Sequence, residues 1–271
     1  MNNISIYNER MAKAIKDKLW FKKFLKIPFF NGGNNGATVY DLGCADGELI
    51  RHLAPEFPNV EFVGIDESDV MINLARQRQM FPNERYITNM KACFESPKNK
   101  PVIVIMSSVF HEIVNYNENP VEVMYDLFVH LRPDYIFFRD MIPDELINRL
   151  ASYEDVEKIR KHADPDMLLE FNLRQGNINN QRNLVHFLLK YRYVENWNRE
   201  VRENYFPCTY QELMKSFPGF DIIFSNKYTL PYIQEIVKED FDIDLIDNTH
   251  VNIIMKSRSN INWFEHCSKI A

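Results

Sequence analysis

The sequence predicts an α/β fold: a doubly wound, seven-stranded, mostly parallel sheet with helices on both faces and an inserted helical segment. From residue 38 to residue 140, short apolar runs alternate with stretches of helical periodicity, which is typical of successive βαβ units. Six of the 8 glycines lie between residues 32 and 64. We therefore expect close backbone approaches around the first two strands.

An amphipathic helix is predicted first, over residues 4–27, and Pro28 with the Asn/Gly run at 31–36 ends it. The strand-like apolar runs that follow are 38–41, 61–66, 85–88, 102–107 and 135–139. The helices predicted between them are 47–53, 69–80 and 121–130.

After residue 140 the pattern changes, because residues 143–204 have helical periodicity, many charges and no strand-like run. The helices predicted in this segment are 154–162, 167–173 and 181–193. A helix over 210–217 capped by Thr209 and strands at 221–225 and 250–256 then resume the sheet pattern. We expect the last two strands to close the sheet as an antiparallel pair.

These patterns divide the chain into four predicted parts. They are an N-terminal helix and loop (1–36), a ligand-binding core (37–142 and 205–257), an inserted lid or substrate-recognition segment (143–204) and a tail (258–271).

Composition limits the class of protein. With 45% hydrophobic and 26% charged residues, the chain has ordinary globular values, and it has no apolar run of the ~18 residues that span a bilayer. The N-terminus lacks the plan of a signal peptide, and the four cysteines are far apart without a C-x-x-C pair. We expect a cytoplasmic protein with no membrane association and no bound metal.

The net charge of −6 disfavours a broadly basic surface for nucleic acid, but the charge is uneven. Residues 10–26 carry seven Lys/Arg against one acid, and residues 158–202 carry nine against five. Solvated helix faces explain such runs most simply. A local patch for an anionic substrate such as RNA, DNA or a phosphorylated metabolite is the sharper interpretation.

The most informative segment is Val39–Ile50, in which an apolar run meets Asp41, and Gly43 and Gly47 then precede an apolar helix. A dinucleotide site needs G-x-G-x-x-G, but Ala45 and Glu48 occupy the second and third glycine positions. The run Asp41-Leu-Gly43-Cys-Ala45-Asp-Gly47 instead resembles the first motif of the class I S-adenosylmethionine-dependent methyltransferases, an acid followed by G-x-G-x-G, with Ala45 at the middle glycine.

The second motif of that family is similar to Val60–Asp66, which is followed by a capped helix beginning near Glu67. The resemblance covers residues 37–140 by motif and 205–256 by pattern. It implies S-adenosyl-L-methionine as cofactor and S-adenosyl-L-homocysteine as product. It implies that Asp41 holds the methionyl end, that the backbone at Gly43, Ala45 and Gly47 passes beneath the ligand, and that Asp66 accepts the ribose hydroxyls. The further cofactor contacts that it implies are Glu67, Met71, Asn89, Met90 and Ser107.

Candidate catalytic residues follow the fourth and fifth strands, whose carboxyl ends should face the ligand. His111 is the first candidate for a base, with Glu112 or Asp140 orienting or replacing it. Arg139 is the candidate for holding an anionic substrate group. The alternatives are that His111 caps a helix and that Arg139 and Asp140 form a structural ion pair.

Other catalytic patterns fail. His111-Glu112 begins an H-E-x-x-H motif, but Asn115 stands at the second histidine position. The chain has no P-loop and no N/D-P-P-Y/F after the fourth strand, and Pro207-Cys208 lies too far along to be a cytosine-C5 nucleophile. Three adjacent residues, Glu265 to Cys267, cannot converge on one ion.

Three functions remain open from the sequence. The leading hypothesis is a methyltransferase acting on an anionic substrate. The substrate is either a nucleotide or single-stranded nucleic acid such as RNA, or a small metabolite. The second is a catalytically silent sensor or interaction subunit that binds S-adenosylmethionine or S-adenosylhomocysteine. The third, a nicotinamide-dependent oxidoreductase, conflicts with Ala45 and Glu48.

Overall fold

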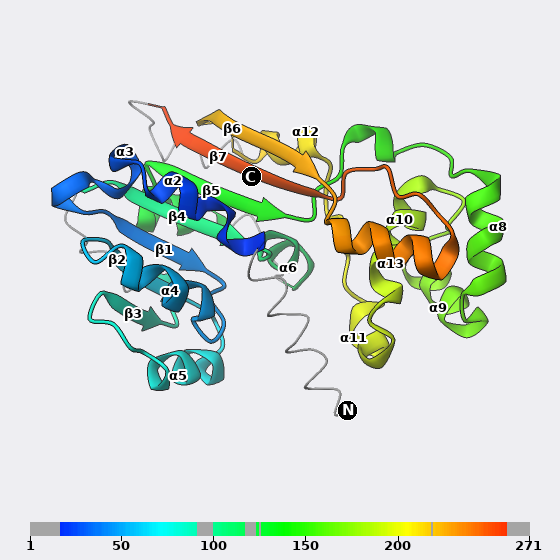
Figure 1. Cartoon of the computed structure of the whole chain (residues 1–271), viewed down its shortest axis with the longest axis horizontal. Coiled ribbons are helices and arrows are strands. Elements are labelled where there is room, and N and C mark those ends of the chain that lie inside the picture. The colour runs from blue at the N-terminus through cyan, green and yellow to red at the C-terminus, as the bar shows by residue number, and fades with distance from the viewer. Residues whose placement is uncertain (1–16, 91–99, 117–122, 125, 218, 259–271) are drawn as a thin grey trace.

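The computed structural model describes residues 17–90, 100–116, 123–124, 126–217 and 219–258. A seven-stranded sheet in the order β3-β2-β1-β4-β5-β7-β6 forms its centre (Figure 1). The strands are β1 (Thr38–Leu42), β2 (Glu61–Ile65), β3 (Glu84–Ile87), β4 (Val102–Ser107), β5 (Tyr135–Asp140), β6 (Phe220–Tyr228) and β7 (His250–Ser257).

Five strands are parallel, and the last two close the sheet. β1 pairs in parallel with β2 and β4, β2 with β3, and β4 with β5, whereas β7 is antiparallel to both β5 and β6. The predicted mostly parallel sheet with an antiparallel closing pair is confirmed.

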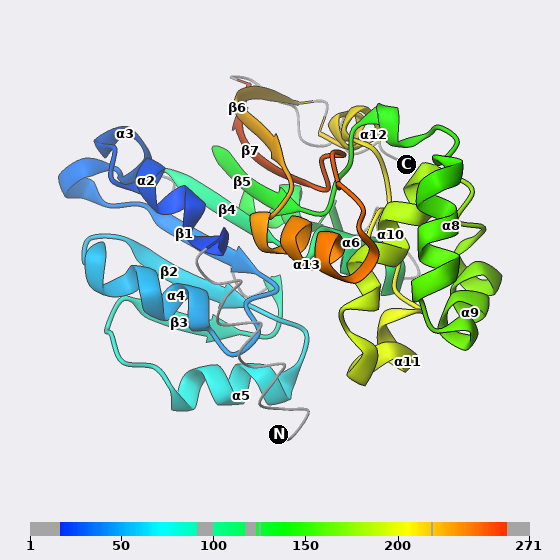
Figure 2. The ribbon, with the colours of Figure 1, turned by 45° about the vertical axis from the view of Figure 1, so that its right-hand side comes forward.

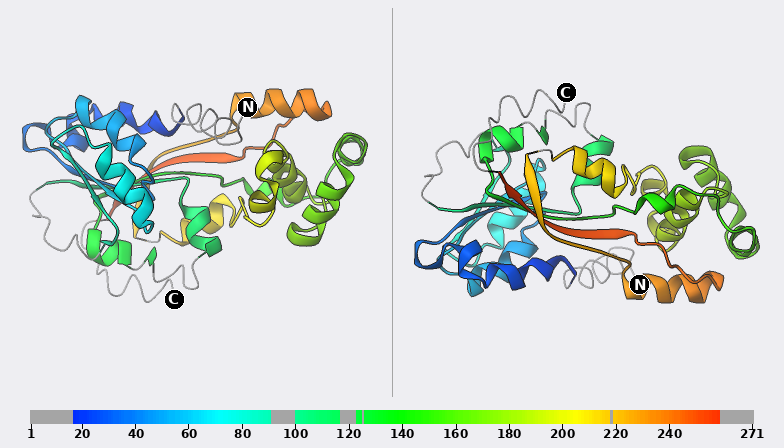
Figure 3. Two further views of the ribbon diagram at one scale, coloured as in Figure 1. Left: turned by 90° about the horizontal axis from the view of Figure 1, so that it is seen from below. Right: turned by 90° about the horizontal axis from the view of Figure 1, so that it is seen from above.

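Helices cover both faces of the sheet (Figure 3). On one face, α2 (Lys22–Leu25), α3 (Pro28–Asn31), α4 (Glu48–Leu53) and α5 (Asp69–Gln77) contribute apolar side chains to one buried cluster. On the other face, α6 (Phe110–Tyr116), the π-helical turn η5 (Leu127–Leu131) and α12 (Tyr210–Lys215) contribute to a second cluster. The predicted cap of α12 is present as a capping box between Thr209 and Glu212.

A separate helical region lies beyond the carboxyl ends of β1 and β5, toward which their arrowheads point in Figure 1. Its helices are α8 (Tyr153–His162), α9 (Pro165–Gln175), α10 (Gln181–Tyr191), η7 (Val194–Asn196), α11 (Trp197–Glu200) and α13 (Pro231–Phe241). All of these helices except η7 contribute to a third buried cluster, which includes Phe171, Phe187 and Phe241. Figure 2 shows α13, which the sequence analysis did not predict, beside α10 although it follows β6 in the chain.

Several predicted helices differ in extent by a few residues, and two of them include residues that the structure does not describe. Residues 4–16 of the predicted N-terminal helix lie outside the described residues, and its described part ends at Leu25 rather than residue 27. Ile27 is extended because the following Pro28 disfavours a helical conformation there. Of the predicted helix at 121–130, residues 121, 122 and 125 lie outside the described residues, residues 123, 124 and 126 are α-helical, and Leu127–Leu131 form a π-helical turn. None of the helices in the described ranges is long and apolar enough to cross a membrane.

The turn between β1 and α4 requires glycine at position 47. Gly47 has a φ of 78°, and an added Cβ would lie 2.6 to 2.7 Å from the ring and hydroxyl of Tyr86 on β3. Gly64 faces the same ring at 2.6 Å. The space that the missing side chain of Gly47 leaves is therefore filled by Tyr86. That the backbone at Gly47 passes beneath a cofactor stays a prediction.

We expect Gly47→Ala to lower the free energy of unfolding by about 2–4 kcal/mol, because it adds left-handed strain to overpacking against Tyr86. Gly33→Ala is the matched control, since Gly33 has a φ of 56° but no atom within 4 Å of an added Cβ. It should cost only about 1–2 kcal/mol. Urea unfolding of both variants checks this, and equal losses would contradict the packing role of Tyr86.

Candidate active site at the strand ends

Two adjoining cavities open at the carboxyl ends of β1, β2 and β4, where doubly wound sheets bind ligands. The smaller, of about 70 Å³, is lined by Lys18, Asp41, Gly43, Cys44, Ala45, Asp46, Glu48, Leu49 and Ser107. The larger, of about 320 Å³, is lined by Leu42, Gly43, Ile65, Asp66, Glu67, Thr88, Asn89, Met90, Val109, Glu112, Ile113, Tyr116 and Val123. Gly43 belongs to both walls, so the two cavities meet at the turn after β1.

Most of the predicted cofactor residues line these cavities. Asp41, Gly43, Ala45 and Ser107 line the smaller one, and Gly43, Asp66, Glu67, Asn89 and Met90 line the larger one. Gly47 and Met71 line neither cavity. Met71 lies on α5 with 40% of its surface exposed, and Gly47 faces the Tyr86 ring. Two other cavities, of about 330 and 350 Å³, lie in the helical region around the Arg149–Asp247 ion pair.

Asp66 ties the turn after β1 to the end of β2. One carboxylate oxygen accepts a hydrogen bond from the Ala45 amide and the other from the Ser68 amide, both at 2.9 Å. Ala45 is a non-glycine residue with a φ of 47°, a conformation that this bond helps to hold. Each oxygen keeps a second lone pair, and Asp66 lines the larger cavity, so it can accept further donors from a ligand.

The smaller cavity holds opposite charges and an unsatisfied hydroxyl. Burial raises the pKa of Asp41 to about 7, with the charge of Asp66 adding to the effect and Lys18 opposing it. Burial and the nearby Arg139 lower the pKa of Lys18. The Ser107 hydroxyl is buried and has no hydrogen-bond partner among the residues that the structure describes. These are groups placed to receive a small ligand that carries both an anion and a cation.

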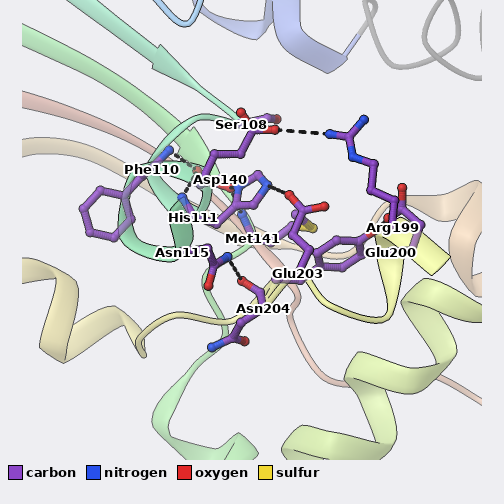
Figure 4. Close-up of polar contacts among 12 residues, drawn as sticks. Ser108, Phe110, His111, Asn115, Asp140, Met141, Arg199, Glu200, Glu203 and Asn204 are labelled. Atoms are coloured by element: carbon purple, nitrogen blue, oxygen red, sulfur yellow. Dashed lines mark hydrogen bonds and ion pairs between the residues drawn. The ribbon is translucent and has the colours of Figure 1, made fainter. Parts of the chain in front are cut away.

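Asp140 organises the ends of β4 and β5 (Figure 4). Its carboxylate accepts hydrogen bonds from the amides of Phe110 and His111, at 2.8 and 3.2 Å, and from that of Met141 at 2.7 Å. The same carboxylate lies 2.7 Å from Nδ1 of His111. The prediction that Asp140 could orient the imidazole agrees with this geometry.

His111 is held on both sides. Its Nε2 lies 3.2 Å from a carboxylate oxygen of Glu203, in the loop after α11. Burial alone would lower the pKa of His111, but the charges and hydrogen bonds of Asp140 and Glu203 raise it to about 10. A general base needs an unprotonated nitrogen that faces the substrate, and His111 presents none while both pairs are intact.

Glu112 is the member of the predicted catalytic set that lines the larger cavity. Burial raises its pKa, and the nearby charge of Glu203 adds to the increase. The guanidinium of Arg199, on α11, lies 3.8 Å from its carboxylate. Neither Glu203 nor Arg199 was predicted, because nothing in the sequence signals that residues some 90 positions apart meet.

Arg139 is engaged elsewhere. It is buried, its Nε donates to Asp17 at 2.6 Å, and it also donates to the Ser108 hydroxyl. The Tyr228 hydroxyl donates to the same Asp17 carboxylate at 3.0 Å. The ion pairs formed are therefore Arg139–Asp17 and Asp140–His111, in place of the Arg139–Asp140 pair weighed as the structural alternative. Holding an anionic substrate would require Arg139 to leave Asp17.

Comparisons with known proteins bear on this site. A model of the methyltransferase domain family matches residues 40–136. A tRNA (guanine-N(7)-)-methyltransferase of Mycoplasma capricolum is 24% identical over 156 residues, which are 56% of this chain and 66% of that protein, just under two thirds of its length.

Solved structures that resemble the chain include an S-adenosylmethionine-dependent methyltransferase of Mesorhizobium loti, at 14% identity and a TM-score of 0.49, covering 88% of this chain and 97% of that one. They also include the plantazolicin methyltransferase BamL in complex with S-adenosylhomocysteine, at 15% identity and a TM-score of 0.47, covering 94% and 89%.

The strand order, with β7 antiparallel beside β5, and the family match over β1 to β5 define a methyltransferase domain. Residues 40–136 match the methyltransferase domain family, and this match together with the fold supports S-adenosylmethionine as the cofactor. The residues present fit that group. Asp41 and Lys18 match the ammonium and carboxylate of its methionyl end, the Ser107 hydroxyl lacks a partner in the described part of the chain, and Asp66 has free acceptor capacity.

We expect cofactor affinity to fall about five- to tenfold between pH 7.5 and pH 6, because Asp41 takes up a proton near pH 7 and loses its attraction for the methionyl ammonium. In Asp41→Asn the affinity should be lower and nearly independent of pH in this range. Calorimetric titration with S-adenosylmethionine checks both, and an unchanged profile in the variant would contradict the placement of Asp41.

The same substitution should raise the free energy of unfolding at pH 8. The pKa of Asp41 in the folded state, about 7, lies above its unfolded value, so the folded state binds the proton more tightly and loses stability as pH rises from about 4 to 7. Asn carries no charge to bury, so that loss should be absent. Urea unfolding at pH 5 and pH 8 measures the difference, and a variant less stable than the wild type at pH 8 would contradict it.

Proposed function

We propose that this protein catalyses methyl transfer from S-adenosylmethionine to an anionic substrate, an RNA or a nucleotide. The observation that carries the proposal is the pair of cavities that meet at Gly43, one lined by Asp41, Lys18 and Ser107 and the other by Asp66 and Glu112. The similarity to a tRNA (guanine-N(7)-)-methyltransferase supports a nucleic-acid substrate. The spacing of the cysteines favours a cytoplasmic location.

The bound cofactor supplies an activated methyl group, and the chain holds the two partners in line. Asp41 and Lys18 fix one end of the donor, and Asp66 fixes its sugar. Glu112 faces the larger cavity and has a raised pKa, so it is the group placed to accept a proton from the nucleophile. Arg199, whose side chain is 59% exposed beside Glu112, is placed to meet an anionic group of the substrate.

His111 has a positioning role in this proposal. Asp140 and Glu203 hold its ring, and His111 in turn places the start of α6, from which Glu112 projects. The segment 143–204, together with α13, forms the wall of the substrate side. Arg139 acts through Asp17 by holding the N-terminal helix, and with it Lys18, over the smaller cavity.

Replacing Asp66 by Ala should weaken cofactor binding by about 1–3 kcal/mol, because the ribose hydroxyls lose their acceptor. Asp69→Ala is the control, since Asp69 is an exposed acid three residues later, in the first turn of α5. Calorimetry with S-adenosylmethionine and with NAD measures both. Equal losses in the two variants, or preferential binding of NAD, would contradict the assignment.

If the substrate is RNA, binding of a tRNA pool should weaken steeply between 50 and 200 mM salt, by about tenfold or more, because bound cations are released when phosphates are neutralised. Transfer of labelled methyl groups to the same pool should follow binding. Activity on a small metabolite that does not depend on salt would instead show that the substrate is a small molecule and not RNA. Cofactor binding without transfer to RNA or to a cell extract would favour the silent sensor.

A further inference from the structure

We propose that His111, Glu112 and Glu203 form a binding site for one divalent first-row metal ion, open to the larger cavity. One ligand atom from each of the three residues lies within 4.8 Å of the other two. Ligands bound at about 2.1 Å lie roughly 3 Å apart when adjacent and about 4.2 Å apart when opposite. The three side chains therefore need only a small inward movement to share an ion. No metal was expected from the sequence, because Asn115 stands at the second histidine position of H-E-x-x-H, and Glu203 lies far along the chain from His111 and Glu112.

The orientation of His111 is that of a metal ligand. Its Nδ1 is 2.7 Å from the buried carboxylate of Asp140, which is itself held by three backbone amides. Histidines that bind metals donate the other ring N–H to a carboxylate or a carbonyl, which fixes the tautomer and directs the free nitrogen at the ion. Here that nitrogen, Nε2, points at Glu203, as Figure 4 shows.

The two glutamates come from different layers of the molecule. Glu203 is almost fully buried in the loop after α11, and Glu112 is half-buried on α6 at the wall of the larger cavity. An ion here would join the sheet domain to the helical region. It would also keep a coordination position open on the side of Glu112.

Charge balance favours a cation. Asp140, Glu203 and Glu112 contribute three carboxylates around one imidazole, and Arg199 is mostly exposed at 3.8 Å. With a protonated imidazole this set has a net charge of about −2, since three negative charges face one positive charge. A divalent ion that replaces the Nε2 proton reduces it to about −1. Buried charges are tolerated when they are paired or when they bind a metal.

One imidazole nitrogen with two carboxylates suits Mn²⁺, Fe²⁺ or Zn²⁺. The open position faces the larger cavity on the Glu112 side, away from the Asp66 side assigned to the cofactor, so an oxygen or nitrogen of a substrate entering there would bind the ion and become easier to deprotonate. This catalytic role rests on the proposed methyltransferase function. The metal site itself does not, because it can be measured without cofactor or substrate.

The test is titration of the full chain with Mn²⁺ after dialysis against a chelator, following the paramagnetic resonance signal of the free ion. We expect one bound ion per chain. Glu112→Gln should weaken binding at least tenfold, and Asp140→Asn by about 10- to 100-fold. Glu112→Gln is the decisive variant, since that side chain is 44% exposed and its loss leaves the fold intact.

Glu157→Gln is the matched control, because Glu157 is 45% exposed and also faces an arginine, Arg160, on its own helix. It should bind Mn²⁺ as the wild type does. No binding of Mn²⁺ or Zn²⁺ by the wild type at millimolar concentration, or equal binding by Glu112→Gln and the wild type, would overturn the site and leave an Asp–His–Glu ion network. If the wild type binds Mn²⁺ but does not bind S-adenosylmethionine, the metal site stands and only the proposed function is contradicted.

Discussion

The carboxylate of Asp140 is the contact on which the site depends. It is fully buried, and a buried carboxylate is costly unless donors surround it. The amides of Phe110, His111 and Met141 and the His111 ring supply those donors. Because the amides come from the start of α6 and from the end of β5, one side chain fixes how two strand ends meet. Through His111 and Glu203 the same contact reaches the helical region. These ion pairs hold the start of α6 in place, and Glu112 projects from that turn into the wall of the larger cavity.

A second ion network closes the opposite side of the site. Asp17 joins Arg139 and the Tyr228 hydroxyl, which belong to β5 and β6, and places Lys18 beside Asp41 at the end of β1. Both networks are formed by residues that are distant in the sequence. Removing one partner from either network would leave a buried charge unpaired, which destabilises the protein more than the loss of a surface ion pair does. The cavities at Gly43 therefore lie between two rigid walls, and the turn itself is held by the bond from the Ala45 amide to Asp66.

The sequence predicted the sheet because short apolar runs alternate with helical stretches, and the resemblance to the methyltransferase motifs proposed Asp41, Asp66 and Ser107, which the sheet places at the carboxyl ends of its strands. It did not predict the role of Gly47, because the Tyr86 ring that fills its space is 39 residues away. The helix α13 carried a usable signal, with Ile233, Val237 and Phe241 four residues apart and all buried, but its acidic side chains obscured the periodicity. The contacts of Glu203 and Asp17 depend on how the helical region and the N-terminal helix pack, which no local pattern encodes.

The partners of Arg139 and Asp140 follow from the period of a strand, and this rule explains the layout of the whole site. Successive side chains of a strand point to opposite faces, so neighbours in β5 cannot pair with each other. Tyr135 and Phe137 pack in the cluster under the N-terminal helices, which places Arg139 on that face. Ile136 and Phe138 pack in the α6 cluster, which places Asp140 on the other face.

Asp41 and Ser107 lie on the same face of the sheet as Arg139. Each stands two residues after Val39 or Ile105, which belong to the cluster under the N-terminal helices. The groups that fit the methionyl end therefore gather on one face, and the His111 set gathers on the other. Among the residues that the structure describes, Gly43 lines both cavities, and the alternation of the strands separates the groups proposed for the methionyl end from the His111 set.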